Sequence, residues 1–91
     1  MKITNFKWDD RNTEHISRHN VTLDEAEEVF ADDAAIFLRS RSGRYVALGQ
    51  TEAGRYLTVV YERKSGGVIR VVTAFDMDEK NRRRYRHERR S

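Results

Sequence analysis

Apolar residues recur every three or four positions between residues 22 and 32, which is the spacing of one face of an α-helix. The residues of this stripe are Leu23, Ala26, Val29 and Phe30. Thr22 and Glu25 stand where a capping box requires them, because each side chain can bond to the backbone N–H of the other residue. The pattern therefore predicts a helix that begins after Thr22 and ends near Asp32.

A weaker helical pattern precedes this stripe. Either Asp9 or Asp10 can cap its first turn, since a carboxylate accepts hydrogen bonds from unpaired backbone N–H groups. We predict a helix that runs from these residues through His19 and ends at Asn20. The residues expected on its inner face are Asn12, His15, Ile16 and His19.

Five further segments combine β-branched and aromatic residues with alternating polarity, which is typical of strands. They cover residues 3–8, 35–38, 44–51, 55–62 and 68–75. Short turns that contain glycine separate the last four, so these four are expected to form an antiparallel meander. A last helix is predicted from the cap at residues 76–79 to about Glu88.

The predicted fold class is α+β, with the element order β-α-α-β-β-β-β-α in one domain over residues 1–91. Two N-terminal helices should pack on one face of a single antiparallel sheet, and residues 80–91 should form a basic C-terminal helix end. Strict alternation places Thr73 on the same side as Val71, and Ala74 on the other side with Arg70.

Charge is distributed unevenly along the chain. The net charge is +3, but residues 80–91 carry seven Lys or Arg and one Glu, or +6, so residues 1–79 carry −3. Such a basic segment attracts phosphates, or is simply a solvated helix end. The chain has no cysteine, and it lacks an apolar run long enough to cross a bilayer, so a cytoplasmic protein without membrane contact is expected.

One residue of the predicted sheet needs an explanation. Arg70 lies in an otherwise apolar strand, and a guanidinium cannot escape burial by losing its proton. It must therefore form an ion pair, for which Glu62 is a candidate, or face a phosphate at an open surface.

Several ordered segments resemble the BrnT-like ribonuclease toxins. The resemblance covers nearly the whole chain and rests on residues 6–9, Asn12, 15–30, 44–49, 57–61, 69–74 and 82–85. It implies a RelE-like fold and metal-independent cleavage of RNA, with growth inhibition as the outcome. It also implies neutralisation by a ribbon-helix-helix (BrnA-like) antitoxin. The expected assembly is a homodimer or a toxin–antitoxin hetero-oligomer.

The chain departs from the family pattern after its last strand, where the family usually has an arginine and this sequence has Phe75. If that arginine stabilises charge in the reaction, this protein is slower or recruits another arginine.

RNA cleavage by the 2′-hydroxyl needs a base, an acid and cations that stabilise the phosphorane. The catalytic candidates are Arg44 and Arg70 for charge stabilisation, and Tyr61, His19 and Glu62 for proton transfer. The candidates for RNA binding are Arg41, Arg82, Arg83 and Tyr85.

His15 and His19 are four positions apart and resemble a metal pair, but no clear third ligand accompanies them. We therefore expect no metal and no cofactor, with His15 in packing or hydrogen bonding.

Two other classes of function stay open. One is a toxin-like protein-binding module that has lost activity, with Phe75 as the cause. The other is a nucleic-acid binder that acts through its basic tail.

Overall fold

The computed structural model describes residues 3–89, and the last two residues of the predicted basic segment, 90 and 91, lie outside this range. The elements in chain order are β1 (Asn5–Lys7), α1 (Asp10–Ser17), α2 (Leu23–Ala31), β2 (Ile36–Arg39), β3 (Arg44–Gln50), β4 (Tyr56–Lys64), β5 (Val68–Asp76) and α3 (Glu79–Arg89). All eight predicted elements are present, so the α+β class is confirmed. None of the helices in residues 3–89 combines the length and the apolarity that a membrane span needs.

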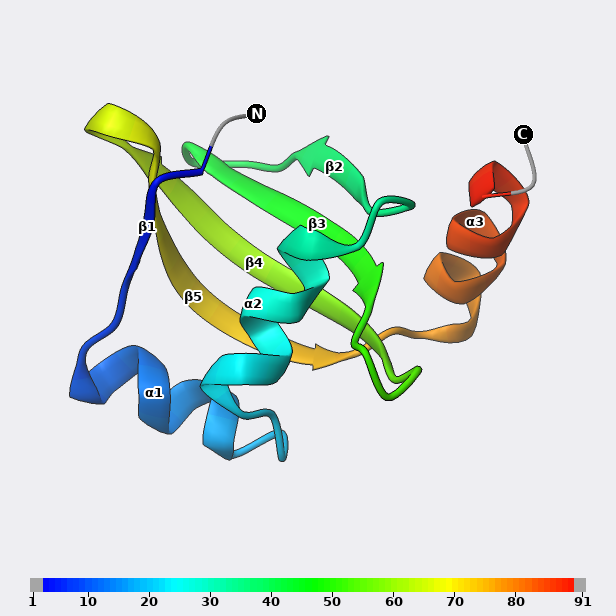
Figure 1. The fold of residues 1–91 in the computed structure, drawn as a ribbon, viewed down its shortest axis with the longest axis horizontal. Helices are drawn as coiled ribbons and strands as arrows, with labels where there is room; N and C mark the ends of the chain where they lie inside the picture. The colour runs from blue at the N-terminus through cyan, green and yellow to red at the C-terminus, as the bar shows by residue number, and fades with distance from the viewer. Residues whose placement is uncertain (1–2, 90–91) are drawn as a thin grey trace.

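The sheet has five strands in the order β1-β5-β4-β3-β2. Strands β2 to β5 form the predicted antiparallel meander, but β1 pairs with β5 in parallel, with Lys7 opposite Arg70. The prediction of a purely antiparallel sheet is therefore wrong at this edge. The reason is that two helices separate β1 from β2, which gives the chain enough length to place β1 at the far side of the sheet (Figure 1).

Both N-terminal helices begin at capping boxes. The Thr22 hydroxyl accepts from the Glu25 N–H at 3.1 Å, and the Glu25 carboxylate accepts from the Thr22 N–H at 3.0 Å, as predicted. Asp9 caps α1 and Asn12 completes its box. Because α1 ends at Ser17, His19 lies outside the helix, and of the four predicted inner residues only Asn12 and Ile16 are buried.

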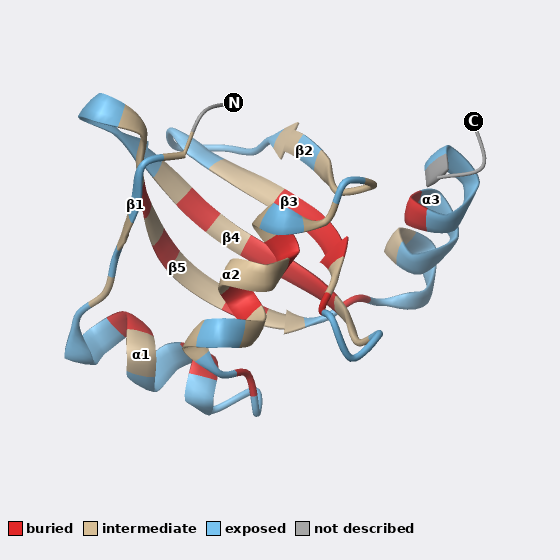
Figure 2. Cartoon of the chain, in the orientation of Figure 1, coloured by how far each residue is buried: buried red, intermediate tan, exposed pale blue. Residues whose placement is uncertain are grey.

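The buried residues form two separate clusters, and Figure 2 shows buried positions along β3, β4 and β5 and on the helices. Helices α1 and α2 cover one face, where the main core includes Ile16, Val29, Val59 and Tyr61. Leu48 alternates with Ala47 and so points to the opposite face, where it packs with Met77, which precedes α3, and with Tyr85, which lies within α3. The second face is therefore covered at one end by α3.

A β-bulge interrupts the register between β4 and β5. Tyr61 pairs with Val71 but Val60 pairs with Thr73, so Val72 is the extra residue. This shift reverses the predicted sides of two residues, because Ala74 is buried in the main core and Thr73 is not. Strict alternation fails for them because a bulge cannot be read from the polarity pattern.

Helix α3 is anchored by its one large aromatic side chain. Tyr85 is fully buried, and its hydroxyl donates to Asp32 Oδ2 at 2.5 Å. Asp32 also accepts from the backbone N–H of Gln50, so this carboxylate joins α3 to β3. The guanidinium of Arg82 lies 4.7 Å from the ring centre of Tyr56, as expected of an arginine that covers apolar surface.

We predict that Tyr85→Phe lowers the free energy of unfolding by about 1.5–3 kcal/mol, because it removes a hydrogen bond to a charged partner. Urea denaturation measures this change, and Tyr45→Phe is a control on an aromatic residue that is only partly buried. Equal stability of the Tyr85→Phe variant and the wild type would contradict the anchoring role of this hydroxyl.

Candidate functional site

A row of alternating charges crosses the second face of the sheet. Arg44 on β3 lies opposite Glu62 on β4, and Glu62 lies opposite Arg70 on β5. The Glu62 carboxylate is 3.9 Å from Arg44 Nε and 3.3 Å from Arg70 Nη1. Because adjacent strands are about 4.8 Å apart, the backbones of the two arginines are about 10 Å apart.

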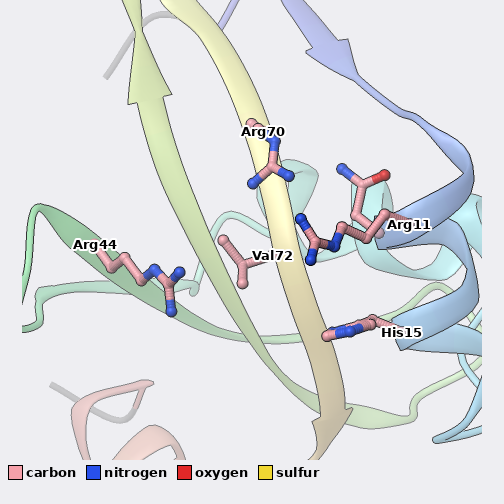
Figure 3. A pocket seen from close by; sticks show the side chains of 6 residues that line it. Arg11, His15, Arg44, Arg70 and Val72 are labelled. Atoms are coloured by element: carbon pink, nitrogen blue, oxygen red, sulfur yellow. The ribbon is translucent and has the colours of Figure 1, made fainter.

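The two arginines also line an open cavity of about 320 Å³. Figure 3 shows Arg44 approaching Val72 from one side of β5, while Arg11 and His15 lie on the other side, on α1. The remaining lining residue is Asn12. We call the cavity lined by these six residues, with its three guanidinium groups, the arginine pocket.

The end of β1 explains how α1 reaches the pocket. β1 stops at Lys7, opposite Arg70, so the edge of β5 beyond this point has no further strand beside it. Asn12 supplies a hydrogen-bond donor to this edge, because its side-chain Nδ2 donates to the carbonyl of Val71 at 2.9 Å. This contact holds α1 against β5 and places Arg11 and His15 beside Val72, the residue of the β-bulge.

Both carboxylates near Arg70 are held in their charged form. Partial burial alone would raise the pKa of Glu62, but the charges of Lys64 and Arg70 and their hydrogen bonds outweigh it and lower that pKa. A backbone hydrogen bond from Asn12 and the charge of Arg70 lower the pKa of Asp9, whose carboxylate is 3.9 Å from Arg70 Nη2. Arg70 is thus paired on two sides, whereas Arg11 has no ion pair among the described residues.

Exposure shows which pocket residues a ligand can reach. The side chains of Arg44 and Arg70 are 48% and 23% exposed, so neither is enclosed by its ion pair. Arg11 and His15 are also exposed. A negatively charged group that enters the pocket can therefore contact guanidinium groups from β3, β5 and α1 together.

Of the five predicted catalytic residues, the structure brings Arg44, Arg70 and Glu62 together. His19 lies elsewhere, with its ring 5.8 Å from that of Phe75. Tyr61 is buried on the α2 side of the sheet between Phe30 and Tyr45, and burial raises the pKa of its hydroxyl. The expected proton-transfer role of Tyr61 therefore needs correction, because a buried phenol on the opposite face cannot reach the pocket.

The four predicted RNA-binding residues lie outside the arginine pocket. Arg41 is exposed in the turn between β2 and β3, and Arg82 and Arg83 are exposed on α3. Tyr85 is fully buried and bonded to Asp32, so its predicted contact with RNA is wrong. The aromatic ring serves the packing of α3 instead.

The two ionisable residues that α1 contributes to the pocket, Arg11 and His15, were not among the predicted site residues. They are four positions apart on α1, and residues at this spacing are neighbours on a helix surface. A signal was therefore present, but the polarity pattern assigned His15 to the inner face, where the structure has only Asn12 and Ile16. Among residues 3–89, no three His, Asp or Glu side chains lie close enough together to hold a metal ion.

The pocket is suited to a phosphodiester, because the planar guanidinium fork matches two phosphate oxygens. In a comparison with family models, residues 8–81 match the model described as "Ribonuclease toxin, BrnT, of type II toxin-antitoxin system". A search of curated proteins found no match. The matched range includes every residue that lines the arginine pocket and covers well over half of the chain. The chain therefore belongs to the BrnT family of ribonuclease toxins of type II toxin–antitoxin systems.

Proposed function

We propose that this protein is an endoribonuclease that cleaves RNA in the arginine pocket, without a metal ion, by attack of the 2′-hydroxyl on the adjacent phosphorus. The observation that carries the proposal is the meeting of Arg11, Arg44 and Arg70 around one open cavity beside Glu62. The family membership supports the class of reaction, and the three guanidinium groups at one cavity support this position for it.

The arginines bind the scissile phosphate and stabilise the charge that grows on its oxygens in the phosphorane. Guanidinium groups suit this task because they stay protonated at any physiological pH. The strands hold Arg44 and Arg70, and a helix fixed by a buried side chain holds Arg11, so all three are positioned before the substrate arrives.

Glu62 accepts the proton of the 2′-hydroxyl in this scheme. Its lowered pKa keeps it ionised at neutral pH, and its position between Arg44 and Arg70 places it beside any phosphate that they bind. The bound phosphate competes for both arginines, which loosens the carboxylate from its ion pairs and allows it to take up a proton.

Arg11 supplies the third cation in place of the arginine that the family pattern expects at Phe75. Phe75 lies opposite Thr58, five residues along β5 from Arg70, and it does not line the pocket. The three arginines that line the pocket are therefore present whichever residue stands at position 75, and this favours an active enzyme over an inactive binding module.

The family implies an antitoxin partner as well as an RNA target. We infer that a ribbon-helix-helix antitoxin of the BrnA type neutralises this chain by covering charged surface that RNA needs. Expression of the chain alone should then arrest growth, and expression with its antitoxin should restore it. Normal growth without the antitoxin would favour an inactive protein-binding module. RNA binding without cleavage, lost when residues 80–91 are removed, would favour a nucleic-acid binder that acts through its basic tail.

The direct test uses the purified chain and two RNA oligonucleotides that differ only in one 2′-deoxy substitution at the cleaved position. Each RNA is offered to the protein both free in solution and bound to translating ribosomes. We expect cleavage of the unmodified RNA to a 2′,3′-cyclic phosphate and a 5′-hydroxyl, with no change in EDTA, and no cleavage at the deoxy position. Cleavage at the deoxy position, or its loss in EDTA, would overturn the proposed mechanism.

A further inference from the structure

We propose that His15 is the proton donor of this reaction, which protonates the 5′ oxygen as it leaves the phosphorus. This inference rests on the proposed function, because it assigns a role at the same pocket. It replaces the two proton-transfer candidates, His19 and Tyr61, that the structure places elsewhere.

The position of His15 is the first argument. It stands one helical turn after Arg11 on α1, and both side chains line the arginine pocket together with Arg44 and Arg70. Figure 3 shows the imidazole on the α1 side of β5, below the guanidinium of Arg11. His15 is exposed, and within residues 3–89 it takes part in no side-chain hydrogen bond or ion pair, so its ring nitrogens are available to a substrate.

The chemistry of the other pocket residues is the second argument. A proton donor must carry a proton at neutral pH and must be able to release it. The guanidinium groups of Arg11, Arg44 and Arg70 hold their protons too strongly. The carboxylate of Glu62 has no proton to give, and Asn12 has no acidic group. Among the groups that line the pocket, imidazole is the side chain whose nitrogens can both bind and release a proton.

The arrangement around β5 is the third argument. In the reaction the attacking 2′ oxygen and the leaving 5′ oxygen lie on opposite sides of the phosphorus, so base and acid must flank the phosphate. Glu62 is on β4 and His15 is on α1, and these two elements contact β5 at its opposite edges. A phosphate held above Val72 and Arg70 therefore lies between the proposed acceptor and the proposed donor.

The step balances as follows. The P–O2′ bond forms and the P–O5′ bond breaks, while the 2′ proton passes to the Glu62 carboxylate and a proton of the His15 imidazolium passes to O5′. The products are a 2′,3′-cyclic phosphate and a 5′-hydroxyl. Neutral His15 and protonated Glu62 return to their starting forms by proton exchange with water.

The test compares His15→Gln with His19→Gln on two substrates. One is an ordinary RNA oligonucleotide, and the other carries sulfur in place of the bridging 5′ oxygen at the same position. A thiolate leaves without being protonated, so loss of the donor should slow cleavage of the first substrate by about 10²–10⁴-fold and the second by only a few-fold. His19→Gln should cleave both substrates at the rate of the wild type.

Two outcomes would overturn the inference while the proposed function stands. One is cleavage of ordinary RNA by His15→Gln at the wild-type rate, and the other is an equal loss on both substrates, which would indicate a positioning residue. Failure of the wild type itself to cleave either substrate would instead remove the proposed function. His15 is exposed, so thermal unfolding of His15→Gln should match that of the wild type and verify that the variant is folded.

Discussion

Replacing Arg70 with alanine is expected to lower kcat/KM for RNA cleavage by about 10²–10³-fold, which is the usual effect of removing one group that stabilises transition-state charge. Arg70 is central to the pocket because it lies on β5, which contacts both β4 and α1, pairs with Glu62 at 3.3 Å and also lines the cavity. The variant should lose growth arrest as well. A gel assay with end-labelled RNA measures the first effect, and colony counts after induction measure the second.

Arg39→Ala is the matched control for this prediction. Arg39 is an exposed strand arginine that pairs with Tyr45, on the α2 side of the sheet, and it makes no ion pair within the described part of the chain. Its removal changes the net charge by the same amount as Arg70→Ala but leaves the pocket intact, so cleavage should stay near the wild-type rate. Equal losses in the two variants would mean that overall charge, rather than the arginine pocket, determines the rate.

The Arg70→Lys variant tests whether the planar shape of the guanidinium group matters for cleavage in addition to its positive charge. Lysine keeps one positive charge but lacks the planar fork that contacts two phosphate oxygens. We therefore expect Arg70→Lys to cleave RNA faster than the alanine variant and more slowly than the wild type. Full activity of the lysine variant would show that a point charge is sufficient at this position.

The helices and the meander could be predicted because their signals are local. The capping box of Thr22 and Glu25 and the apolar stripe that follows depend on neighbouring residues only. The parallel pairing of β1 depends instead on residues about 60 positions away in the sequence, and the bulge at Val72 depends on the register of β4 and β5. Neither can be predicted from the pattern of polar and apolar residues. A RelE-like fold, which the resemblance implies, stays a prediction.

The site was predicted in part for the same reason. Arg70 was identified because a charge in an apolar strand is conspicuous, and its partner Glu62 was named as a candidate. His15 was missed because the polarity pattern assigned it to the inner face of its helix, where only Asn12 and Ile16 are buried. Tyr61 and Tyr85 were misassigned because aromatic residues fill cores and bind bases with the same side chain.

The largest effect on stability is expected at Asn12, a polar side chain with no solvent exposure. Its Nδ2 donates to the carbonyl of Val71 at 2.9 Å, and its Oδ1 accepts from the backbone N–H of Asp9 at 2.7 Å. Asn12→Ala leaves the buried Val71 carbonyl without this donor, which costs about 1–3 kcal/mol, and removes the partly buried hydrogen bond from Asp9, which is worth about 0.5–1.5 kcal/mol. The free energy of unfolding should therefore fall by about 1.5–4.5 kcal/mol. Urea denaturation at neutral pH measures the change.

Asn12 also joins stability to catalysis, because it attaches the helix that carries Arg11 and His15 to the strand that carries Arg70. Fully folded Asn12→Ala protein should therefore still cleave RNA more slowly than the wild type, since α1 is no longer fixed at Val71. Ser17→Ala, at the exposed end of the same helix, should change neither stability nor rate. If Asn12→Ala lost stability but kept the full cleavage rate under native conditions, α1 would have no part in positioning the pocket, and the roles proposed for Arg11 and His15 would fail with it.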